Sequence, residues 1–346
     1  MQSSQSLAPP IRNQVLSAIS TWNTRRVLVT GAGGFIGSHL AERLAELGAR
    51  TRCFLRYTSQ GSVGWLADSP MRPDLEIVHG DIRDSDSVLR AVKDVDVVFH
   101  LAALIGIPYS YHSPRSYVQT NIEGTLNILE AARRCGVQRV ICTSTSEVYG
   151  SAQYVPIDEK HPLQGQSPYS ATKTGADKLA EAYYCSFGLP VSIARPFNTY
   201  GPRQSSRAVI PTIITQALAH SAVKLGNLNA TRDFNFVSDV MEGFIAIAES
   251  PAALGMTLNI GSGAEISIRE LAEIIFELTG AKCTVEIEAE RLRPEASEVD
   301  RLCANSEFMS RVTGWRPKVP LREGLARTID WVGRNLGSYT IGSYSL

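Results

Sequence analysis

The chain has 346 residues and carries 34 basic side chains (Lys+Arg) against 34 acidic ones (Asp+Glu). Hydrophobic residues make up 44% and charged residues 20%, which is typical of a globular protein and excludes a disordered or fibrous chain. Zero net charge argues against a broad nucleic-acid-binding or anionic-membrane surface, since either needs an excess of cations. The sequence shows no run near the ~18 apolar residues of a membrane span. We therefore expect neither nucleic acid nor membrane among the partners.

The cysteines and histidines of the sequence are dispersed. No CxxC, HxxxH or HExxH pattern occurs, so we expect no metal site and no disulfide framework. The first twenty residues lack the basic start and apolar run of a signal peptide. Widely spaced, unpaired thiols are typical of a cytoplasmic protein, which is the location we expect.

Short apolar runs alternate with helical patterns along the first two thirds of the chain. Residues 1–24 form a polar leader with a Pro9-Pro10 break, and we expect it to be loosely ordered. The apolar runs lie at 25–31, 51–55, 75–80, 95–103, 139–145 and 191–196, and helical spacing occupies 38–48, 125–136 and 173–188. Strands that are apolar along their whole length and alternate with helices predict a parallel sheet covered on both faces. The expected fold class is therefore a doubly wound α/β fold.

A glycine-rich segment joins the first apolar run to the first helix. Gly31, Gly34 and Gly37 give the spacing G-x-x-G-x-x-G, with Phe35 and Ile36 between the last two. Small residues let backbone N–H groups and the positive end of the helix approach a pyrophosphate. A tight turn is the simpler alternative, but the position between strand and helix favours dinucleotide binding on a Rossmann-type sheet.

The ends of the next strands should hold the rest of a nicotinamide cofactor. A carboxylate after the second strand suits NAD, whereas a cation suits the 2′-phosphate of NADP. Arg56 stands there without an acid, which favours NADP slightly, although a solvated surface arginine is the alternative. Asp81 is expected near the adenine or, alternatively, as a helix cap. The remaining residues expected beside the cofactor along these strand ends are Ile82, Leu101, Ala102 and Ala103.

Tyr169 and Lys173 are four residues apart and so share one face of a predicted helix. A phenol has a reference pKa of ~10, so it is a poor base near neutral pH. A lysine ammonium and an oxidised nicotinamide would both favour the phenolate. Downstream of a glycine-rich loop, this pair predicts a site of hydride transfer.

The alternation of strands and helices loosens after residue 197. Amphipathic helices are predicted at 210–220 and 266–280, and charged residues crowd 290–301. We expect residues 25–197 to form a dinucleotide-binding Rossmann domain. Residues 198–346 are expected to form mainly a smaller, discontinuous C-terminal lobe that binds substrate.

Seven segments together resemble the extended short-chain dehydrogenase/reductase superfamily, in the branch that acts on nucleotide sugars. In chain order they are TGAGGFIG, GDIRD, FHLAA, TSTSEVYG, YSATK, RPFNTYGPR and RDFNFVSDV, and the resemblance covers residues 25–335. It implies a nucleotide-diphosphate sugar as substrate and a tightly bound NAD or NADP that is recycled. It also implies a homodimer that pairs the helices at 114–135 and 168–186.

The triad Thr145-Ser146-Glu147 is similar to that of 4,6-dehydratases, in the serine version found in GDP-mannose dehydratases. Nucleotide-glucuronate decarboxylases share it, whereas C4-epimerases carry small or apolar residues in place of Glu147. The flanking sequence resembles the UDP-N-acetylglucosamine 4,6-dehydratase group linked to legionaminic-type sugars. UDP-glucuronate decarboxylase, C4-epimerase and a non-catalytic dinucleotide-binding regulator remain alternatives.

The resemblance implies catalytic roles for five residues in forming a 4-keto-6-deoxy sugar. Tyr169 removes the O4 proton during oxidation at C4, Thr145 hydrogen-bonds O4, and Lys173 holds the phenolate and the nicotinamide ribose. Glu147 then removes the C5 proton while water leaves from C6, and Ser146 orients O6. The resemblance also places Thr143 and Pro196 at the cofactor. The residues it implies for substrate binding are Thr145, Asn198, Arg203, Ile210, Arg232 and Arg293.

Overall fold

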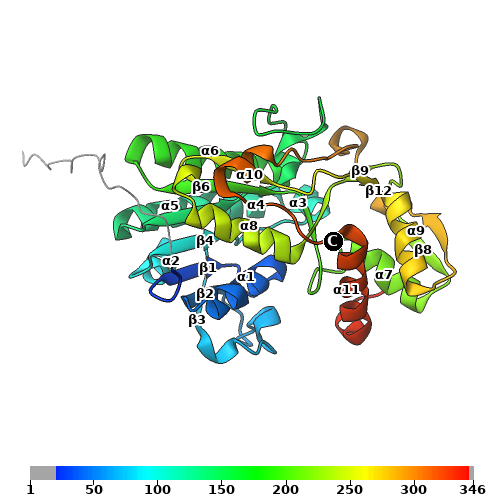
Figure 1. Ribbon diagram of the computed structural model, residues 1–346, viewed down its shortest axis with the longest axis horizontal. Helices are drawn as coiled ribbons and strands as arrows, with labels where there is room; N and C mark the ends of the chain where they lie inside the picture. The colour runs from blue at the N-terminus through cyan, green and yellow to red at the C-terminus, as the bar shows by residue number, and fades with distance from the viewer. Residues whose placement is uncertain (1–20, 343–346) are drawn as a thin grey trace, which may run out of the picture.

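The computed structural model of the protein describes residues 21–342. Its centre is a seven-stranded sheet in the order β11-β6-β5-β4-β1-β2-β3, with every pairing parallel (Figure 1). The strands are β1 Arg26–Thr30, β2 Arg50–Arg56, β3 Leu75–Gly80, β4 Val97–His100, β5 Arg139–Thr143, β6 Val191–Pro196 and β11 Thr257–Ile260. The chain runs outward from β1 to β3 and then returns to β4 on the other side of β1. This confirms the predicted Rossmann-type fold, in which ligands bind at the carboxyl ends of the strands beside such a switch point.

Helices cover both faces of the sheet because neighbouring strand residues point to opposite sides. Val27 and Val29 pack with one apolar cluster, whereas Leu28 between them belongs to the other. The first cluster lies under α1 Phe35–Glu46, α8 Val237–Glu249 and α10 Glu307–Thr313. The second lies under α2 Ser85–Val92, α5 Gly124–Cys135 and α6 Pro168–Phe187. Two short helices, α3 Ile107–His112 and α4 Pro114–Tyr117, and a π-helical turn Val118–Glu123 lead into α5.

The edge strand β11 comes from beyond residue 197. It pairs with β6, and Leu258 on this strand packs in the same cluster as Phe244 of α8 and Met309 of α10. The chain therefore returns to the sheet after leaving it. The division of the chain into two domains at residue 197 remains a proposal. One strand of the sheet, β11, comes from the sequence after that boundary.

A smaller lobe lies beside the sheet at one end of the molecule (Figure 1). It contains α7 Val209–Ala219, α9 Ile268–Thr279 and α11 Leu321–Arg334 around an apolar cluster of its own. Three two-stranded pairs complete it: β7 Asn198–Tyr200 with β10 Phe234–Phe236, β8 Ala222–Leu225 with β13 Thr284–Ile287, and β9 Thr231–Arg232 with β12 Ile266–Ser267.

The segment ahead of β1 differs from expectation. Residues 1–20 of the predicted leader lie outside the described residues, but Trp22 is buried in the core against Phe99, with ring centroids 6.2 Å apart. Its indole Nε1 donates a 2.7 Å hydrogen bond to Glu249 of α8. This part of the leader is therefore fixed by apolar packing and by one polar contact.

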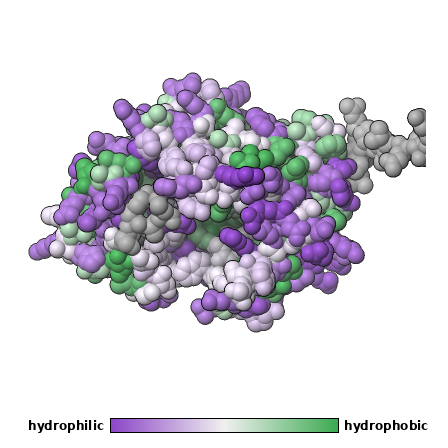
Figure 2. All heavy atoms as spheres, turned by 180° about the vertical axis from the view of Figure 1, so that it is seen from behind, coloured by the Kyte–Doolittle hydropathy of each residue, from purple (hydrophilic) through white to green (hydrophobic). Residues whose placement is uncertain are grey.

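The opposite face of the molecule is hollowed near its middle, with apolar side chains at the floor of the hollow (Figure 2). All six cysteines are free thiols. Among residues 21–342, no helix combines the length and the apolar character needed to cross a membrane. The same part of the chain gathers no group of three or more His, Cys, Asp or Glu side chains suited to a metal ion.

Candidate active site

A cavity of about 1040 Å³ lies where the glycine-rich segment, the carboxyl ends of the strands and the lobe meet. It is lined by nearly all the residues predicted for the site. Those are Gly31, Gly34, Phe35, Ile36, Gly37, Arg56, Asp81, Ile82, Leu101, Ala102, Ala103, Thr143, Thr145, Ser146, Glu147, Tyr169, Lys173, Pro196, Asn198, Ile210, Arg232 and Arg293. Arg203 is the predicted site residue that does not line it.

Arg203 is engaged elsewhere. Its guanidinium donates to both carboxylate oxygens of Glu42 on α1, at 2.9 and 3.0 Å, and to the hydroxyl of Ser38 at 3.1 Å. The ion pair is largely buried, with side-chain exposures of 16% and 13%. We correct the prediction on this ground: Arg203 fastens the segment after β7 to α1, and we assign it no substrate contact.

The glycine-rich loop leaves room for a ligand at the start of α1. Gly31 has φ +71°, a conformation that L side chains rarely adopt, and a Cβ at Gly37 would lie 2.2 Å from the carbonyl oxygen of Gly31. No side chain of the described chain caps the start of α1 at Gly34, so its first N–H groups face the cavity uncapped. The loop therefore fits a pyrophosphate at a helix N-terminus.

A second loop lies directly on the glycine-rich loop. The backbone N–H of Trp65 donates to the carbonyl of Gly33 at 3.1 Å, and a Cβ on Gly64, whose φ is +59°, would lie 2.2 Å from that carbonyl oxygen. The Trp65 ring packs edge-on against Trp331 of α11, with centroids 5.3 Å apart. The lobe thus holds a loop that borders the predicted cofactor site, and the sequence patterns gave no sign of this contact.

Helix α6 presents acid–base residues to the end of β5 over three successive turns. The Tyr169 hydroxyl is hydrogen-bonded to Thr145, and the Lys173 ammonium donates to the carbonyl of Thr143. One turn further, Asp177 accepts a 2.7 Å hydrogen bond from Ser144. The spacing of four residues places all three side chains on one helix face.

Burial shifts both members of the tyrosine–lysine pair away from their ionised forms. Burial raises the pKa of the Tyr169 phenol, and the hydrogen bond from Thr145 counteracts this. Burial lowers the pKa of the Lys173 ammonium, and the negative charge of Asp177 counteracts that shift. The pair can act as a base only when a neighbouring positive charge favours the phenolate.

Glu147 and two arginines form the charged side of the cavity. Glu147 lies in the 3₁₀ turn Ser146–Tyr149, and its side chain is 12% exposed. The Arg293 Nη1 lies 3.5 Å from a Glu147 carboxylate oxygen, and Arg232 lies 3.7 Å from Glu298. Burial lowers the pKa of the Arg232 guanidinium. Two cations on this side of the cavity, the buried Arg232 and the partly exposed Arg293, suit a substrate with a diphosphate group.

Three buried acceptor atoms in the wall have no hydrogen-bond partner among residues 21–342. They are the Thr143 Oγ1, the Asn198 Oδ1 and the Gln204 Oε1. Buried polar atoms are normally paired, so these atoms are free to bind donors of a ligand. The sequence reasoning missed Gln204 and Glu298. Gln204 directly follows the RPFNTYGPR segment, which was the available signal; Glu298 lies in a charged stretch without a motif.

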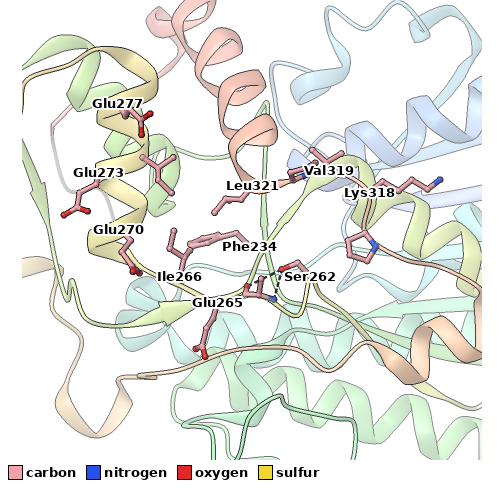
Figure 3. A pocket seen from close by; sticks show the side chains of 14 residues that line it. Phe234, Ser262, Glu265, Ile266, Glu270, Glu273, Glu277, Lys318, Val319 and Leu321 are labelled. Carbon is pink, nitrogen blue, oxygen red and sulfur yellow. Dashed lines mark hydrogen bonds between the residues drawn. The ribbon is translucent and has the colours of Figure 1, made fainter.

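A second cavity, of about 790 Å³, lies between α9 and residues 317–321 (Figure 3). Its glutamates are mostly engaged: Glu265 pairs with Arg301, Glu277 with Arg322, and Glu270 accepts from the Ser267 cap of α9. It contains none of the predicted site residues, so we place the chemistry in the larger cavity.

A family model described as GDP-mannose 4,6 dehydratase matches residues 28–328. The chain belongs to the nucleotide-sugar epimerase/dehydratase family of extended short-chain dehydrogenases/reductases. Within this family, the UDP-glucose 4-epimerase of Mycolicibacterium smegmatis is 36% identical over 88% of this chain and 98% of its own. The dTDP-glucose 4,6-dehydratase of Streptomyces griseus is 35% identical over 89% and 94%.

Solved structures of the epimerase/dehydratase family share the fold. The dTDP-glucose 4,6-dehydratase DesIV of Streptomyces venezuelae, solved with NAD and TYD bound, has a TM-score of 0.82 at 33% identity. The match covers 91% of this chain and 98% of that one. The family resemblance read from the seven segments is therefore confirmed.

Proposed function

We propose that the protein is a nucleotide-sugar 4,6-dehydratase that forms a 4-keto-6-deoxy sugar, with UDP-N-acetylglucosamine or a related nucleotide hexose as substrate. The observation that carries the proposal is Glu147. A largely buried carboxylate shares one cavity with Tyr169 and Lys173, which gives the site a second base besides the phenol. The dTDP-glucose dehydratases among the relatives support the same reaction class.

The protein's own residues divide the chemistry into two proton transfers. When bound, the nicotinamide would accept hydride from C4 and later return it to C6. Tyr169 takes the O4 proton, and Thr145 and Lys173 stabilise its phenolate. The C4 ketone acidifies the C5 proton, which Glu147 takes and passes to O6, so that O6 leaves as water while Ser146 orients it. Arg232 and Arg293 hold the diphosphate as charge-assisted donors.

We propose NAD or NADP as the cofactor. NAD in the S. venezuelae dehydratase supports the first, and Arg56 in the cavity wall favours the second slightly. Asp81 is paired with Arg83 at 2.6 Å and so carries a partly neutralised charge. If Arg56 holds a 2′-phosphate, Arg56→Asp should weaken NADP binding and leave NAD binding nearly unchanged. Equal effects on the two affinities would show that Arg56 acts only as a surface charge.

C4-epimerisation is the second candidate, favoured by the identity to the M. smegmatis epimerase. Epimerisation needs only the base at O4, so Tyr169, Lys173 and Thr145 would suffice and Glu147 would have no task. Decarboxylation of a glucuronate needs a cation near the sugar carboxylate. Arg203 is paired with Glu42, and Arg207, which lines the cavity, is the remaining candidate.

Mass spectrometry after incubation with a panel of nucleotide sugars tests the reaction. Loss of water supports the dehydratase. Loss of carbon dioxide would replace it by the decarboxylase, and an unchanged mass with inverted configuration at C4 would replace it by the epimerase. A protein that binds dinucleotide and converts no sugar would be a regulator.

Glu147→Gln tests the assigned base. General-base contributions are typically ~10²–10⁴-fold, so product formation should fall by about that factor while substrate still reduces the cofactor. Tyr169→Phe should abolish both steps. Nicotinamide absorbance in a single turnover, followed beside product formation, separates the two cases. Near-normal turnover of Glu147→Gln would refute the mechanism.

A further inference from the structure

Arg195 on β6 joins the two elements that carry the acid–base groups. Its side chain is 2% exposed. The Nη2 and Nε atoms donate to Asp177 of α6 at 2.8 and 3.1 Å, and the Nη1 atom donates to the hydroxyl of Tyr149 at 3.1 Å. One buried guanidinium therefore bridges α6, which carries Tyr169 and Lys173, and the turn that carries Glu147.

Tyr149 anchors the turn that carries Glu147 to the interior of the protein. It is the last residue of the turn Ser146–Tyr149, two positions after Glu147, and its side chain is completely buried. Its hydroxyl accepts from Arg195 and donates to Asn259 Oδ1 on β11 at 2.7 Å. The Arg195 guanidinium carbon also lies 5.1 Å from the centre of the Tyr149 ring. The hydroxyl is thus held on two sides by buried groups.

Arg195 thus has two branches of contacts, one through Tyr149 and one through Asp177, and the second leads to Tyr169. Asp177 binds Arg195 and also accepts from Ser144, which directly precedes Thr145 in the chain. Thr145 in turn is hydrogen-bonded to Tyr169. None of Arg195, Asp177 and Tyr149 lines the cavity, so these three act through the residues that do.

We propose that Arg195, with Asp177 and Tyr149, sets the position of Glu147 relative to Tyr169 and Lys173, and that the Tyr149 hydroxyl is the positioning group for the elimination step. This rests on the proposed function, because it takes Glu147 as the C5 base. A displacement of about 1 Å in a reacting group can cost ~10²-fold in rate. The two branches end at different bases, so their loss should slow different steps.

Tyr149→Phe removes the hydroxyl and keeps the ring. We expect elimination to slow by about ten-fold or more, hydride transfer to the nicotinamide to change by less than about two-fold, and KM to stay unchanged. Reduced nicotinamide should then accumulate in a single turnover, and exchange of the C5 hydrogen with solvent deuterium should slow. A purely structural role would lower the amount of folded enzyme and leave the ratio of the two steps as it was.

Tyr200→Phe is the matched control. Tyr200 is also completely buried and its hydroxyl donates to the carbonyl of Leu321 at 3.1 Å, but it does not line the cavity. This variant should keep the ratio of the two steps. Melting temperatures of both variants measure the loss of stability caused by removing one buried hydrogen bond.

Ser144→Ala tests the Asp177 branch should Tyr149→Phe fail to fold. It removes one of the hydrogen bonds to Asp177 and should slow hydride transfer more than elimination. Ser192→Ala is its control, since Ser192 is equally buried on β6 and donates to Ala253. If wild type yields no 4-keto-6-deoxy product, the proposed function fails; if it does and Tyr149→Phe slows both steps equally or neither, the positioning role alone is overturned.

Discussion

Tyr169 illustrates at the scale of one residue why the site needs its neighbours. Burial raises the pKa of the phenol and so opposes the phenolate that the proposed chemistry requires. Thr145 is the neighbour that works against this shift, through its hydrogen bond to the phenol oxygen. The hydroxyl at position 145 should therefore set the pH at which the enzyme becomes active.

Thr145→Val should move the acid limb of the pH profile of kcat/KM to higher pH. The phenolate is the active form, so a higher pKa means that more alkaline solution is needed to populate it. One hydrogen bond of about 1.4 kcal/mol corresponds to a shift of about one pH unit. Thr328→Val, at a buried threonine that donates to Gly324 within α11, should leave the profile in place. An unmoved limb in Thr145→Val would show that this hydrogen bond does not control the phenol.

Local motifs were enough to predict many of the residues that line the candidate cavity. Gly31 directly follows β1, and Glu147 and Tyr169 lie at the start of a 3₁₀ turn and of α6. Neighbours in the sequence determine these positions, so the local motif of each residue also indicated its place in the cavity. Arg203 was different because its partner Glu42 lies on α1, far away in the chain. No pattern around an arginine reveals which distant carboxylate it meets.

At the scale of elements, the loop Thr58–Trp65 packs directly on the glycine-rich loop. Its contact depends on a glycine with positive φ at Gly64 and on a backbone oxygen of Gly33. Hydrophobic periodicity carries no information about such a contact, since neither group is an apolar side chain. The strands were predictable because their apolar runs are continuous. The position of β11 at the edge of the sheet depends instead on which strand still has an unpaired hydrogen-bonding edge.

Gly64→Ala should reduce the amount of dinucleotide that purifies with the protein. The new Cβ would lie 2.2 Å from the Gly33 oxygen and would push the two loops apart. Gly61→Ala is the control, because Gly61 has a similar φ of +63° and nothing lies within 4 Å of its Cβ. Absorbance of dinucleotide released on denaturation measures both. Equal retention by the two variants would show that the Gly64 contact does not shape the cofactor site.

At the scale of the whole molecule, α5 and α6 expose apolar side chains. Leu126 is 39% exposed and Phe187 51%, whereas Leu129 on the same helix as Leu126 is completely buried in the core. A homodimer through these helices remains our proposal, with Leu126 rather than Leu129 at the contact. Exposed apolar side chains on adjacent helices are typical of interfaces between subunits.

Leu126→Arg should convert the proposed dimer into a monomer of 37.7 kDa. A cation at the centre of an apolar contact loses its hydration without a partner. Leu218→Arg places the same charge at a leucine that is 40% exposed on α7, far from these helices in the chain, and should leave the dimer intact. Light scattering at micromolar concentration measures both, and a wild-type monomer would remove the idea.

The edge strand β11 has a consequence for synthesis of the chain. The ribosome releases β1 to β6, together with Thr145, Glu147, Tyr169 and Lys173, before Thr257–Ile260 emerge, and until then β6 has an unpaired edge. Such an edge can recruit a strand from a neighbouring nascent chain. Tyr149 meets its acceptor Asn259 only when β11 docks, so the turn with Glu147 acquires this buried contact after the other six strands of the sheet have been made. The residues to which we assign catalytic roles are thus made before this contact can form.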